Sequence, residues 1–453
     1  MTELLSIILA AGEGTRMKSA LPKVLHPVGG LPVVSHVLRT VLASGSQVAV
    51  VVGPNHDAVE AAVHSWAPGA PIARQHERLG TGHAVLQAKA SYDAASGHVI
   101  VLYADTPLVT AQTLAEIVAR LDGGADMVVL GFRPKDPTGY GRLLTKDGRV
   151  YAIREHKDAS EEERKIGLCN SGILGFRGDT LRSVIERIGN SNAKGEYYLT
   201  DAVELAAGDG KRIDYIEVNA NELIGVDDRS KLAQAEATFQ ELRRDDFMKA
   251  GVTLKDPKSV WFSYDTQIAR DVTIEPNVVF GPGVTIEEGA VIHAFSHIEG
   301  AHIGRNASIG PFARLRPAAN IGADAKVGNF VEIKKADIGV GAKVSHLSYV
   351  GDATIGANVN IGAGVITVNY DGFNKYQTVV GDGAFIGSNS SLVAPVNVGA
   401  GGFVVTGSVI TEDVEADAMA FARSRQTNKP GRAKEFFEQA KAKKLASKQA
   451  KKV

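Results

Sequence analysis

A glycine-rich stretch near the start of the chain has the composition of a phosphate-binding loop. The segment AAGEGTRMKSALPK follows the apolar run LSIIL, and its Gly12 and Gly14 let backbone N–H groups approach a triphosphate closely. Arg16 and Lys23 follow within reach and can neutralise phosphate charge. No Gly-Lys-Ser or Gly-Lys-Thr sequence follows, so the segment is not a Walker loop.

An acidic residue stands where a second buried strand is expected to end. The run HVIVLYADTP reaches Asp105 after its last apolar residues, and a carboxylate at the carboxyl end of a strand is well placed to hold Mg²⁺ against phosphates. The alternative is that Asp105, just before Thr106 and Pro107, caps the helix that follows. The two roles are compatible, because both put the side chain at a strand end.

The elements that must position these residues alternate in type over residues 1–228. Short apolar runs predict strands, and the segments between them have helical patterns. The predicted strands are 5–9, 47–53, 98–104 and 125–132, and the helical segments include 31–44 and 106–121. This alternation predicts a doubly wound α/β domain with a mostly parallel sheet. Ligands of such sheets bind outside the carboxyl ends of the strands.

A long polar segment follows this domain. Residues 229–250, RSKLAQAEATFQELRRDDFMKA, are rich in helix formers and contain no glycine or proline. They predict a single connecting helix that stops at Gly251.

From residue 268 onward, apolar residues recur at every sixth position, with occasional shifts of one residue. These anchors are Ile268, Ile274, Phe280, Ile286, Ile292, Ile298, Ile303, Ile309, Leu315, Ile321, Val327, Ile333, Ile338, Val344, Val350, Ile355, Ile361, Val380, Ile386, Leu392, Val398, Val404 and Ile410. The period predicts a solenoid in which three hexads form a triangular coil and stacked coils share one core. Ordinary antiparallel strands are the alternative, but they do not explain a six-residue period sustained over this length.

Small residues stand four positions after many of the anchors and should share the narrow coil interior. They are Val272, Val278, Ala307, Ala313, Ala325, Ala342, Val359 and Ser390. Glycine and asparagine residues are expected at the corners, where the backbone turns with positive φ. The period breaks over residues 367–379, TVNYDGFNKYQTV, which predicts a loop that projects from the coil.

Composition excludes several classes of protein. The net charge of the 453 residues is -1, which argues against a nucleic-acid partner, and no apolar run approaches the roughly 20 residues of a membrane span. The single cysteine, Cys169, cannot form an intrachain disulfide, and the N-terminus lacks the basic segment of a signal peptide. We therefore expect a cytoplasmic protein without a membrane or nucleic-acid partner.

The tail from Gly431 onward has an excess of lysine and arginine over acidic residues. A solvated helix is the favoured interpretation, and a tail that binds phosphate or RNA is the alternative.

Further motifs complete both halves of the chain. The first half contains Pro22-Lys23, GTGHA, TGYGR, EHKDA, CNSGI, GEYYLTD and GVDDR, and the second contains GPFARLRP, VGNFVEIKKA, SHLSYVGDA, NIGAGVITVNYDG, FIGS and LVAPV. In this order, and along nearly the whole chain, they resemble the bacterial bifunctional N-acetylglucosamine-1-phosphate uridylyltransferases/glucosamine-1-phosphate acetyltransferases.

The resemblance implies three parts and an assembly. Residues 1–228 would form a Rossmann-like nucleotide-diphospho-sugar transferase domain and residues 229–250 a linker helix. Residues 251–453 would form a left-handed parallel β-helix of hexapeptide repeats with acetyltransferase activity and a basic tail. The chain would assemble as a homotrimer, with acetyl-CoA and the amino sugar phosphate bound between subunits.

For the first site, the resemblance implies residues that bind UTP and the UDP-N-acetylglucosamine product. They are Leu9, Ala10, Ala11, Gly12, Gly14, Arg16, Lys23, Gln75, Gly80, Thr81, Tyr103, Asp105, Gly141, Glu155, Asn170 and Asp227. Lys23 would also act in catalysis, and Asp105 and Asp227 would hold Mg²⁺. The family usually has Asn in place of Asp227, and an aspartate there brings an additional negative charge.

For the second site, the resemblance implies that His346 is the base that removes a proton from the sugar amine. A histidine suits this task because imidazole exchanges protons near neutral pH. The implied glucosamine 1-phosphate contacts are Arg316, Lys334, Tyr349 and Asn360, and the implied acetyl-CoA contacts are Ala363, Asn369, Tyr370, Ser388, Thr406 and Arg423. The family often has alanine at the position of Thr406.

The implied activity is the synthesis of UDP-N-acetylglucosamine for peptidoglycan and lipopolysaccharide. Acetyl transfer from acetyl-CoA to glucosamine 1-phosphate would be followed by uridylyl transfer from UTP. Two alternatives are a monofunctional sugar-1-phosphate nucleotidyltransferase with a structural β-helix and a β-helix scaffold that binds sugar nucleotides without turnover. The first predicts loss of SHLSY and NYDG, and the second predicts loss of Lys23 or the metal acid, yet all are present.

Overall fold

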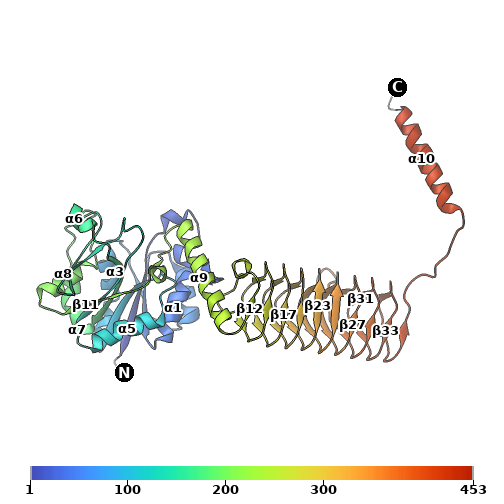
Figure 1. Ribbon diagram of the computed structural model, residues 1–453, viewed down its shortest axis with the longest axis horizontal. Coiled ribbons are helices and arrows are strands. Elements are labelled where there is room, and N and C mark those ends of the chain that lie inside the picture. The colour runs from blue at the N-terminus through green and yellow to red at the C-terminus, as the bar shows by residue number, and fades with distance from the viewer. Residues whose placement is uncertain (1–2, 451–453) are drawn as a thin grey trace. The chain divides into compact units, whose positions relative to one another are not determined.

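A computed structural model describes residues 3–450, so Lys451 and Lys452 of the predicted basic tail lie outside the described residues. The chain divides into two compact units: the first extends to Thr285 and the second begins at Ile286 (Figure 1). The first unit therefore contains the predicted nucleotidyltransferase domain, the predicted linker helix and the first turns of the repeat.

A central sheet organises the first unit. Its strand order is β11-β7-β10-β6-β1-β4-β5, and every neighbouring pair is parallel except those of β10, which runs antiparallel to β6 and β7. The strands are β1 (Leu4–Ala10), β4 (Gln47–Val52), β5 (Ile72–Arg74), β6 (His98–Tyr103), β7 (Met127–Phe132), β10 (Cys169–Arg177) and β11 (Ile213–Glu217); a hairpin of β8 (Arg142–Lys146) and β9 (Arg149–Arg154) extends from β10, and β2 (Pro27–Val28) pairs with β3 (Leu31–Pro32). The predicted mostly parallel sheet is confirmed.

Helices cover both faces of this sheet. Successive strand residues face opposite sides, so Ile8 packs in one hydrophobic cluster and Ile7 in the other. The first cluster contains α1 (Val33–Ala43), α2 (Asp57–Trp66) and α5 (Ala111–Asp122), and the second contains α3 (Thr81–Gln87), α4 (Lys89–Ala94), α7 (Gly178–Val184) and α8 (Asp201–Gly208); α6 (Glu161–Arg164) is a short exposed turn. Both faces are buried, as the doubly wound prediction requires.

The helix predicted over 106–121 begins later than expected. It starts at Ala111, because the Thr110 side chain caps it by accepting a hydrogen bond from the Thr113 N–H at 3.1 Å. The alternative that Asp105 caps this helix is therefore wrong, and its carboxylate is left for other contacts.

The predicted linker helix is α9 (Arg229–Lys249), which ends before Gly251 at φ +92° as expected. Its N-terminus is capped by the Asp228 side chain, and its Phe239 packs in a buried cluster with Val28. Gly29, at φ +54°, makes this packing possible, because a Cβ there would lie 2.2 Å from the Phe239 ring. The helix is therefore an integral part of the first unit.

The repeat begins within the first unit. Its strands there are β12 (Thr253–Leu254), β13 (Gln267–Ile268), β14 (Thr273–Ile274) and β15 (Val279–Phe280), and β16 (Thr285–Ile286) lies at the division. β12 and β14 pair in parallel, and the anchors Ile274 and Phe280 are buried. The expected anchor Ile268 is only half-buried, because the pattern is still incomplete at this first turn.

The second unit is a parallel β-helix whose coils stack one on the next (Figure 1). One ladder consists of β17 (Val291–Ile292), β20 (Ser308–Ile309), β23 (Lys326–Asn329), β25 (Lys343–His346), β27 (Asn360–Ile361), β30 (Phe385–Ile386), β33 (Phe403–Val404) and β35 (Met419–Ala420). The remaining strands are β18 (His297–Ile298), β19 (Ala301–Ile303), β21 (Arg314–Leu315), β22 (Ala319–Ile321), β24 (Glu332–Ile338), β26 (Tyr349–Ile355), β28 (Ile366–Val368), β29 (Thr378–Val380), β31 (Ser391–Val393), β32 (Val396–Val398) and β34 (Val409–Ile410).

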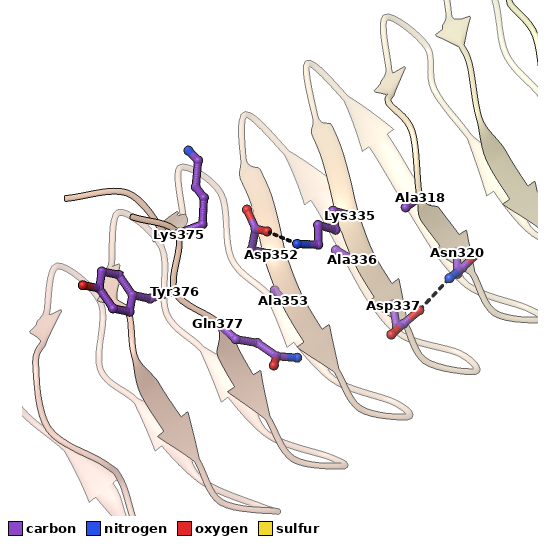
Figure 2. A pocket seen from close by; sticks show the side chains of 10 residues that line it. All are labelled: Ala318, Asn320, Lys335, Ala336, Asp337, Asp352, Ala353, Lys375, Tyr376 and Gln377. Atoms are coloured by element: carbon purple, nitrogen blue, oxygen red, sulfur yellow. Dashed lines mark hydrogen bonds and ion pairs between the residues drawn. The ribbon is translucent and has the colours of Figure 1, made fainter. Parts of the chain in front are cut away.

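The hexad pattern describes the core of this unit correctly. All predicted anchors from Ile286 to Ile410 are buried, and so are the small residues from Ala307 to Ser390. Long strands β24 and β26 pass through a corner at Lys335 and Asp352, which have φ values of +45° and +47°. Figure 2 shows these two side chains joined on neighbouring coils.

The predicted projecting loop is shorter than expected. Thr367 and Thr378 belong to β28 and β29 and are buried, so the loop spans 369–377. Its ends are joined by an antiparallel bridge between Tyr370 and Lys375, and the Lys375 ammonium lies 4.0 Å from the Tyr370 ring centre.

The C-terminal helix α10 (Arg432–Ala450) has exposed side chains over its described length, which agrees with a solvated helix. Over residues 3–450, we find no helix with both the length and the apolar character needed to span a membrane.

Candidate active sites

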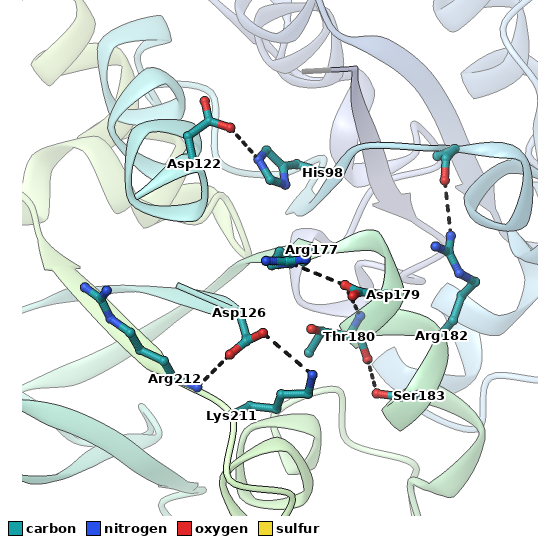
Figure 3. Close-up of polar contacts among 11 residues, drawn as sticks. His98, Asp122, Asp126, Arg177, Asp179, Thr180, Arg182, Ser183, Lys211 and Arg212 are labelled. Carbon is teal, nitrogen blue, oxygen red and sulfur yellow. Dashed lines mark hydrogen bonds and ion pairs between the residues drawn. The ribbon is translucent and has the colours of Figure 1, made fainter. Parts of the chain in front are cut away.

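The two edges of the sheet in the first unit differ in character. At the edge where β6, β7 and β11 begin, polar side chains join neighbouring segments: His98 Nε2 lies 2.9 Å from Asp122 Oδ1, and the Lys211 ammonium lies 3.7 Å from Asp126 Oδ1 (Figure 3). The parallel strands end at the other edge, where the glycine-rich loop follows β1. The cavity described next lies there, as expected for this type of sheet.

A cavity of about 300 Å³ collects most of the residues predicted to bind the nucleotide. The predicted residues that line it are Leu9, Ala10, Ala11, Gly12, Lys23, Gln75, Gly80, Thr81, Tyr103 and Asp105. They come from β1, the loop after it, the segment before α3 and the end of β6, so the sheet topology brings distant segments together.

Four charged side chains form a compact cluster beside this cavity. The Lys23 ammonium contacts the Asp105 carboxylate and lies 3.1 Å from Asp227 Oδ1, and Arg16 Nη2 lies 3.0 Å from that same oxygen. The Val226 N–H donates to the Asp105 carbonyl at 2.8 Å, which fixes the segment carrying Asp227 against the end of β6. The cluster is electrically balanced, with two cations and two anions.

The lysine of this cluster is held in its charged form. Burial by itself would lower the pKa of Lys23, but the carboxylates of Asp105 and Asp227 outweigh burial and raise that pKa above its usual value. Gly14 makes room for this lysine, because it has φ +64° and a Cβ there would lie 2.5 Å from the Lys23 Cβ. The glycine therefore has a local steric role in addition to its expected approach to phosphate.

The carboxylates fit a magnesium site only in part. Among residues 3–450 no group of three or more His, Cys, Asp or Glu side chains could hold a metal ion by itself. The carboxylates of Asp105 and Asp227 nevertheless both contact the Lys23 ammonium, so a metal cation close to that position would lie near both carboxylates. Magnesium prefers oxygen ligands, and phosphate oxygens of the nucleotide would complete its shell.

The segment before α3 is fixed by a buried amide. Gln75 donates from Nε2 to the Gly80 carbonyl at 3.0 Å and lies 3.1 Å from His83 Nδ1. Arg78 was not predicted, yet it also lines the cavity: its Nε donates to the Ala11 carbonyl at 2.9 Å and its Nη1 lies 2.5 Å from Glu13 Oε1. This arginine ties the glycine-rich loop to the segment before α3.

The residues predicted on the sugar side form a second group. Glu155 accepts a hydrogen bond from Thr200 Oγ1 at 3.3 Å, and a Cβ at Gly141 would lie 3.2 Å from the Glu155 carboxylate. Burial raises the pKa of Glu155 although the Thr200 bond opposes this. The Asn170 N–H donates to the Gly141 carbonyl at 2.8 Å, so the three predicted residues lie together but do not line the cavity of 300 Å³.

In the second unit, His346 lies on the outside of the coil. Its neighbours Val344 and Ser348 are buried, which confirms the predicted outward direction of the histidine. His346 Nδ1 lies 2.6 Å from Asn329 Oδ1 on the preceding coil. Because an amide oxygen only accepts, this contact requires a proton on Nδ1, and in the neutral imidazole Nε2 then has the free electron pair that a base needs. Asn329 was not predicted.

The residues predicted to bind glucosamine 1-phosphate lie mainly on the adjoining face. Arg316 pairs with Glu332 at 2.7 Å, and this hydrogen bond raises the pKa of Arg316. The Arg316 N–H donates to the Ile333 carbonyl at 2.9 Å, just after β21, which places Arg316 beside Lys334 on β24. Tyr349 on β26 is in register with Glu332, the partner of Arg316. Asn360 is in register with Lys343 on the ladder that carries His346.

The residues predicted on the acetyl-CoA side follow His346 along one column of coils. The Gly364 N–H donates to the His346 carbonyl, the Asn389 N–H to Ala363 and the Gly407 N–H to Ser388, which stacks the corresponding corners. The column continues with Thr406, which is exposed, and Arg423. Asn369 and Tyr370 lie at the start of the projecting loop. The column therefore aligns His346, Ala363, Ser388, Thr406 and Arg423 along successive coils.

Comparison with known proteins finds a different family model in each half of the chain. Residues 6–166 match the model of the MobA-like NTP transferase domain, and residues 265–300 and 300–335 match the bacterial transferase hexapeptide model of six repeats. The bifunctional protein GlmU of Azorhizobium caulinodans is 56% identical over 429 residues, which cover 94% of this chain and 96% of the relative. The bifunctional protein GlmU of Agrobacterium fabrum is 54% identical over 447 residues, 98% and 99% of the two chains.

The fold and sites thus define a nucleotidyltransferase joined to a hexapeptide-repeat acyltransferase. The chain belongs to the family of bifunctional GlmU proteins. The predicted resemblance is confirmed, and the chain is a bifunctional uridylyltransferase and acetyltransferase. The alternative of a monofunctional nucleotidyltransferase with a structural β-helix is set aside, because the match to bifunctional relatives extends over both halves.

Proposed function

We propose that the chain makes UDP-N-acetylglucosamine by two transfers at the two sites described above. The observation that carries the proposal is the exposed His346, whose Nδ1 contacts Asn329 and so leaves Nε2 as the acceptor of the neutral imidazole. A purely structural β-helix has no need of such a histidine, whereas acetyl transfer to an amine requires a base.

In the acetyl transfer, the amine of glucosamine 1-phosphate attacks the thioester carbonyl of acetyl-CoA. His346 Nε2 accepts a proton from the amine as the N–C bond forms, and the C–S bond then breaks to release the CoA thiolate, which takes up a proton. Arg316 and Lys334 bind the sugar phosphate, and Tyr349 and Asn360 bind the sugar. The acetyl-CoA contacts are Ala363, Asn369, Tyr370, Ser388, Thr406 and Arg423.

In the uridylyl transfer, a phosphate oxygen of N-acetylglucosamine 1-phosphate attacks the α-phosphorus of UTP. The bond from that phosphorus to the bridging oxygen breaks, and pyrophosphate leaves. Lys23 and Arg16 exchange their carboxylate partners for phosphate oxygens and stabilise the developing charge. Mg²⁺ held by Asp105 and Asp227 would add charge neutralisation at the triphosphate, and no covalent intermediate on the protein is needed.

The second site also supports a homotrimer. Leu347, at a corner with φ +52°, separates His346 on β25 from Tyr349 on β26, and these strands belong to different sheets. Side chains that point outward from two different faces of one coil do not converge on one ligand. We infer that His346 of one subunit and the Arg316, Lys334 and Tyr349 group of another complete a shared site.

An apolar stripe beside His346 supports the same assembly. Phe295, Phe312 and Phe330 stack at 4.9 and 5.1 Å between ring centres, and the stripe reaches the corner of Leu347. These four side chains are 45–63% exposed in the single chain. A continuous exposed apolar row next to a site is typical of a subunit interface.

The proposed location is the cytoplasm, because UTP and acetyl-CoA are the co-substrates. The product would supply peptidoglycan and lipopolysaccharide synthesis.

A single mixture tests the coupling of the two activities. The purified protein is incubated with Mg²⁺, UTP, acetyl-CoA and glucosamine 1-phosphate, and free thiol and pyrophosphate are measured together. We expect both products, and we expect pyrophosphate release to stop when acetyl-CoA is omitted and to return with N-acetylglucosamine 1-phosphate. Pyrophosphate without thiol release would reject the acetyltransferase half of the proposal.

A further inference from the structure

The buried carboxylate of Asp352 is connected by hydrogen bonds to two of the proposed acetyl-transfer residues, Asn369 and, through it, Tyr349. Asp352, on β26, is only 9% exposed. Its Oδ2 accepts a hydrogen bond from Asn369 Nδ2 at 2.5 Å, and its Oδ1 lies 3.3 Å from the Lys335 ammonium of the preceding coil (Figure 2). Both carboxylate oxygens therefore have a partner, one from the proposed acetyl-CoA side and one from the wall of the coil.

This carboxylate determines how the Asn369 side chain is turned. A carboxylate only accepts hydrogen bonds, so it must face the NH₂ end of the amide, and the carbonyl end of Asn369 points away from it. The same Nδ2 lies 3.5 Å from the hydroxyl of Tyr349, which is a proposed sugar contact. One amide group thus connects Asp352 with residues proposed for both substrates.

The backbone around Asp352 is adapted to this arrangement. A Cβ at Gly351 would lie 2.3 Å from the Tyr349 hydroxyl, so the glycine lets that hydroxyl fold back toward Asn369. The backbone of Gly351 is in turn held by the buried Thr367, whose Oγ1 accepts from its N–H at 2.8 Å and donates to its carbonyl at 3.0 Å.

A purely structural ladder on the same surface offers a comparison. Asp337 accepts a hydrogen bond from Asn320 Nδ2 at 2.8 Å across adjacent coils, and both side chains are exposed (Figure 2). That pair reaches none of the proposed site residues. Asp352 has a similar bond to an asparagine, but it is buried and its asparagine belongs to the proposed acetyl-CoA contacts.

We propose that Asp352 is a positioning residue for acetyl transfer: it fixes the Asn369 amide, and through it the Tyr349 hydroxyl, in the orientation that binds acetyl-CoA beside the amino sugar. The proposal rests on the proposed function of Asn369 and Tyr349. Lys335 neutralises the buried carboxylate and leaves Oδ2 to Asn369.

The direct test is Asp352→Asn, with Asp337→Asn as the matched control. An amide has only one accepting end, so the substituted side chain cannot accept from both Lys335 and Asn369 as a carboxylate does. Asparagine also tolerates positive φ, so the corner is not strained by the change. We expect a rise of about tenfold in KM for acetyl-CoA with uridylyl transfer unchanged, and a change below about twofold in the control. A KM within about twofold of the parent for Asp352→Asn would overturn the proposal.

Two further variants separate positioning from general stability. Asp352→Asn combined with Lys335→Met should restore KM to within about threefold of the parent, because the remaining amide oxygen is then free for Asn369. In an Asn369→Ala background, Asp352→Asn should have almost no additional effect on acetyl-CoA binding. An undiminished effect in that background would show that Asp352 does not act through Asn369.

Calorimetric titration of acetyl-CoA keeps the test independent of turnover. If the parent binds acetyl-CoA but does not acetylate, the proposed function fails while the coupling of Asp352 and Asn369 is still measured as a dissociation constant. Should Asp352→Asn not fold, Asn369→Asp replaces it. The carboxyl groups of Asp352 and Asp at position 369 would then face each other and share a proton. Loss of that proton makes them repel, so acetyl-CoA affinity should fall as pH rises. An affinity with the parent's pH dependence would overturn the proposal.

Discussion

In the first unit, the residues of the candidate site come from segments far apart in the chain, and the sheet gathers them at one edge. Lys23, Asp105 and Asp227 meet although 204 positions separate the first from the last. In the second unit, successive candidate residues lie about one coil apart along the β-helix, and the coils stack without bringing them to one point. We therefore propose that the first site is complete within one chain, whereas the second site is completed by a neighbouring subunit.

The two sites also differ in how their charged and titratable side chains are held. The cations of the first site are paired with carboxylates that lie beside the same cavity, so they are held in place before any substrate binds. The proposed base of the second site, His346, is exposed, and the described partner of its imidazole is Asn329. A compact fold can preorganise a site by burial, while a solenoid depends on the hydrogen bonds between coils and, in the proposed trimer, on the partner chain.

The largest expected effect comes from His346→Ala. Loss of a general base typically lowers a rate roughly 10²- to 10⁴-fold, so we expect acetyl transfer to fall at least about a hundredfold. Uridylyl transfer from N-acetylglucosamine 1-phosphate should be unchanged, and stability should change by less than about 0.5 kcal/mol because the side chain is on the surface. Assays of both activities on the same preparation check this. Acetylation within a few-fold of the parent would remove His346 from the mechanism.

Asp105→Asn tests the charged cluster of the first site. Removing one charge from the paired cluster should lower uridylyl transfer by about two orders of magnitude, as is typical when charge stabilisation is lost. Acetyl transfer should be spared. Parallel measurements of pyrophosphate and thiol release give the result, and equal loss of both activities would indicate misfolding instead of a local role.

Phe239→Ala tests whether α9 is part of the first unit. The phenylalanine is 8% exposed and packs on Gly29, so its removal should destabilise this unit by about 3 kcal/mol. Both tryptophans, Trp66 and Trp261, lie in the first unit, so the urea dependence of their fluorescence reports on it alone. The exposed Leu242→Ala on the same helix is the control and should have little effect. Equal midpoints for both variants would mean that α9 only connects the two parts.

The smallest expected effect concerns the pH dependence of the first unit. Burial, followed by Glu204 and Glu155, raises the pKa of Asp201 to about 6. A carboxyl group whose pKa is higher in the folded state favours folding at low pH, and this contribution is lost as pH rises from about 4 through 6. Since Asp201 is half-buried, solvent screening reduces the effect to about 1 kcal/mol.

Asp201→Asn should therefore stabilise the first unit at pH 7.5 by about 1 kcal/mol and have little effect at pH 4. Urea unfolding followed by tryptophan fluorescence at the two pH values measures the difference. An identical shift at both values would contradict the assigned pKa.

The sequence predicts the repeat well because its period is a local property. Each anchor from Ile286 to Ile410 needs only its own hexad to be recognised, and all are buried. Errors occur where the period is interrupted, as at Ile268 and at the ends of the loop. The predicted domain limits at 228 and 250 remain predictions; the two compact units divide between Thr285 and Ile286.

Contacts that depend on three-dimensional approach could not be predicted from one sequence. The bond from His346 to Asn329 requires the register of two coils, and that register depends on one-residue shifts along the repeat. The bond from Arg78 to the Ala11 carbonyl requires the approach of two loops. The packing of α9 was also missed, because this largely polar helix buries few apolar side chains, among them Phe239.

We propose that the first site belongs to one chain and that the second is shared between chains. The most direct test is to mix subunits of His346→Ala with subunits of Arg316→Ala after gentle dissociation and to measure acetyl transfer of the reassembled protein. If equal amounts of the two subunits mix at random, about a quarter of the subunit interfaces in a trimer combine an intact His346 with an intact Arg316. We therefore predict about a quarter of the parent activity.

The same mixing of Lys23→Ala with Asp105→Asn should restore no uridylyl transfer beyond the residual activity of each variant, because both residues act within one chain. Acetyl transfer that stays at the level of the separate variants, in mixtures shown by light scattering to contain trimers of both kinds of subunit, would show that the second site is not shared between subunits.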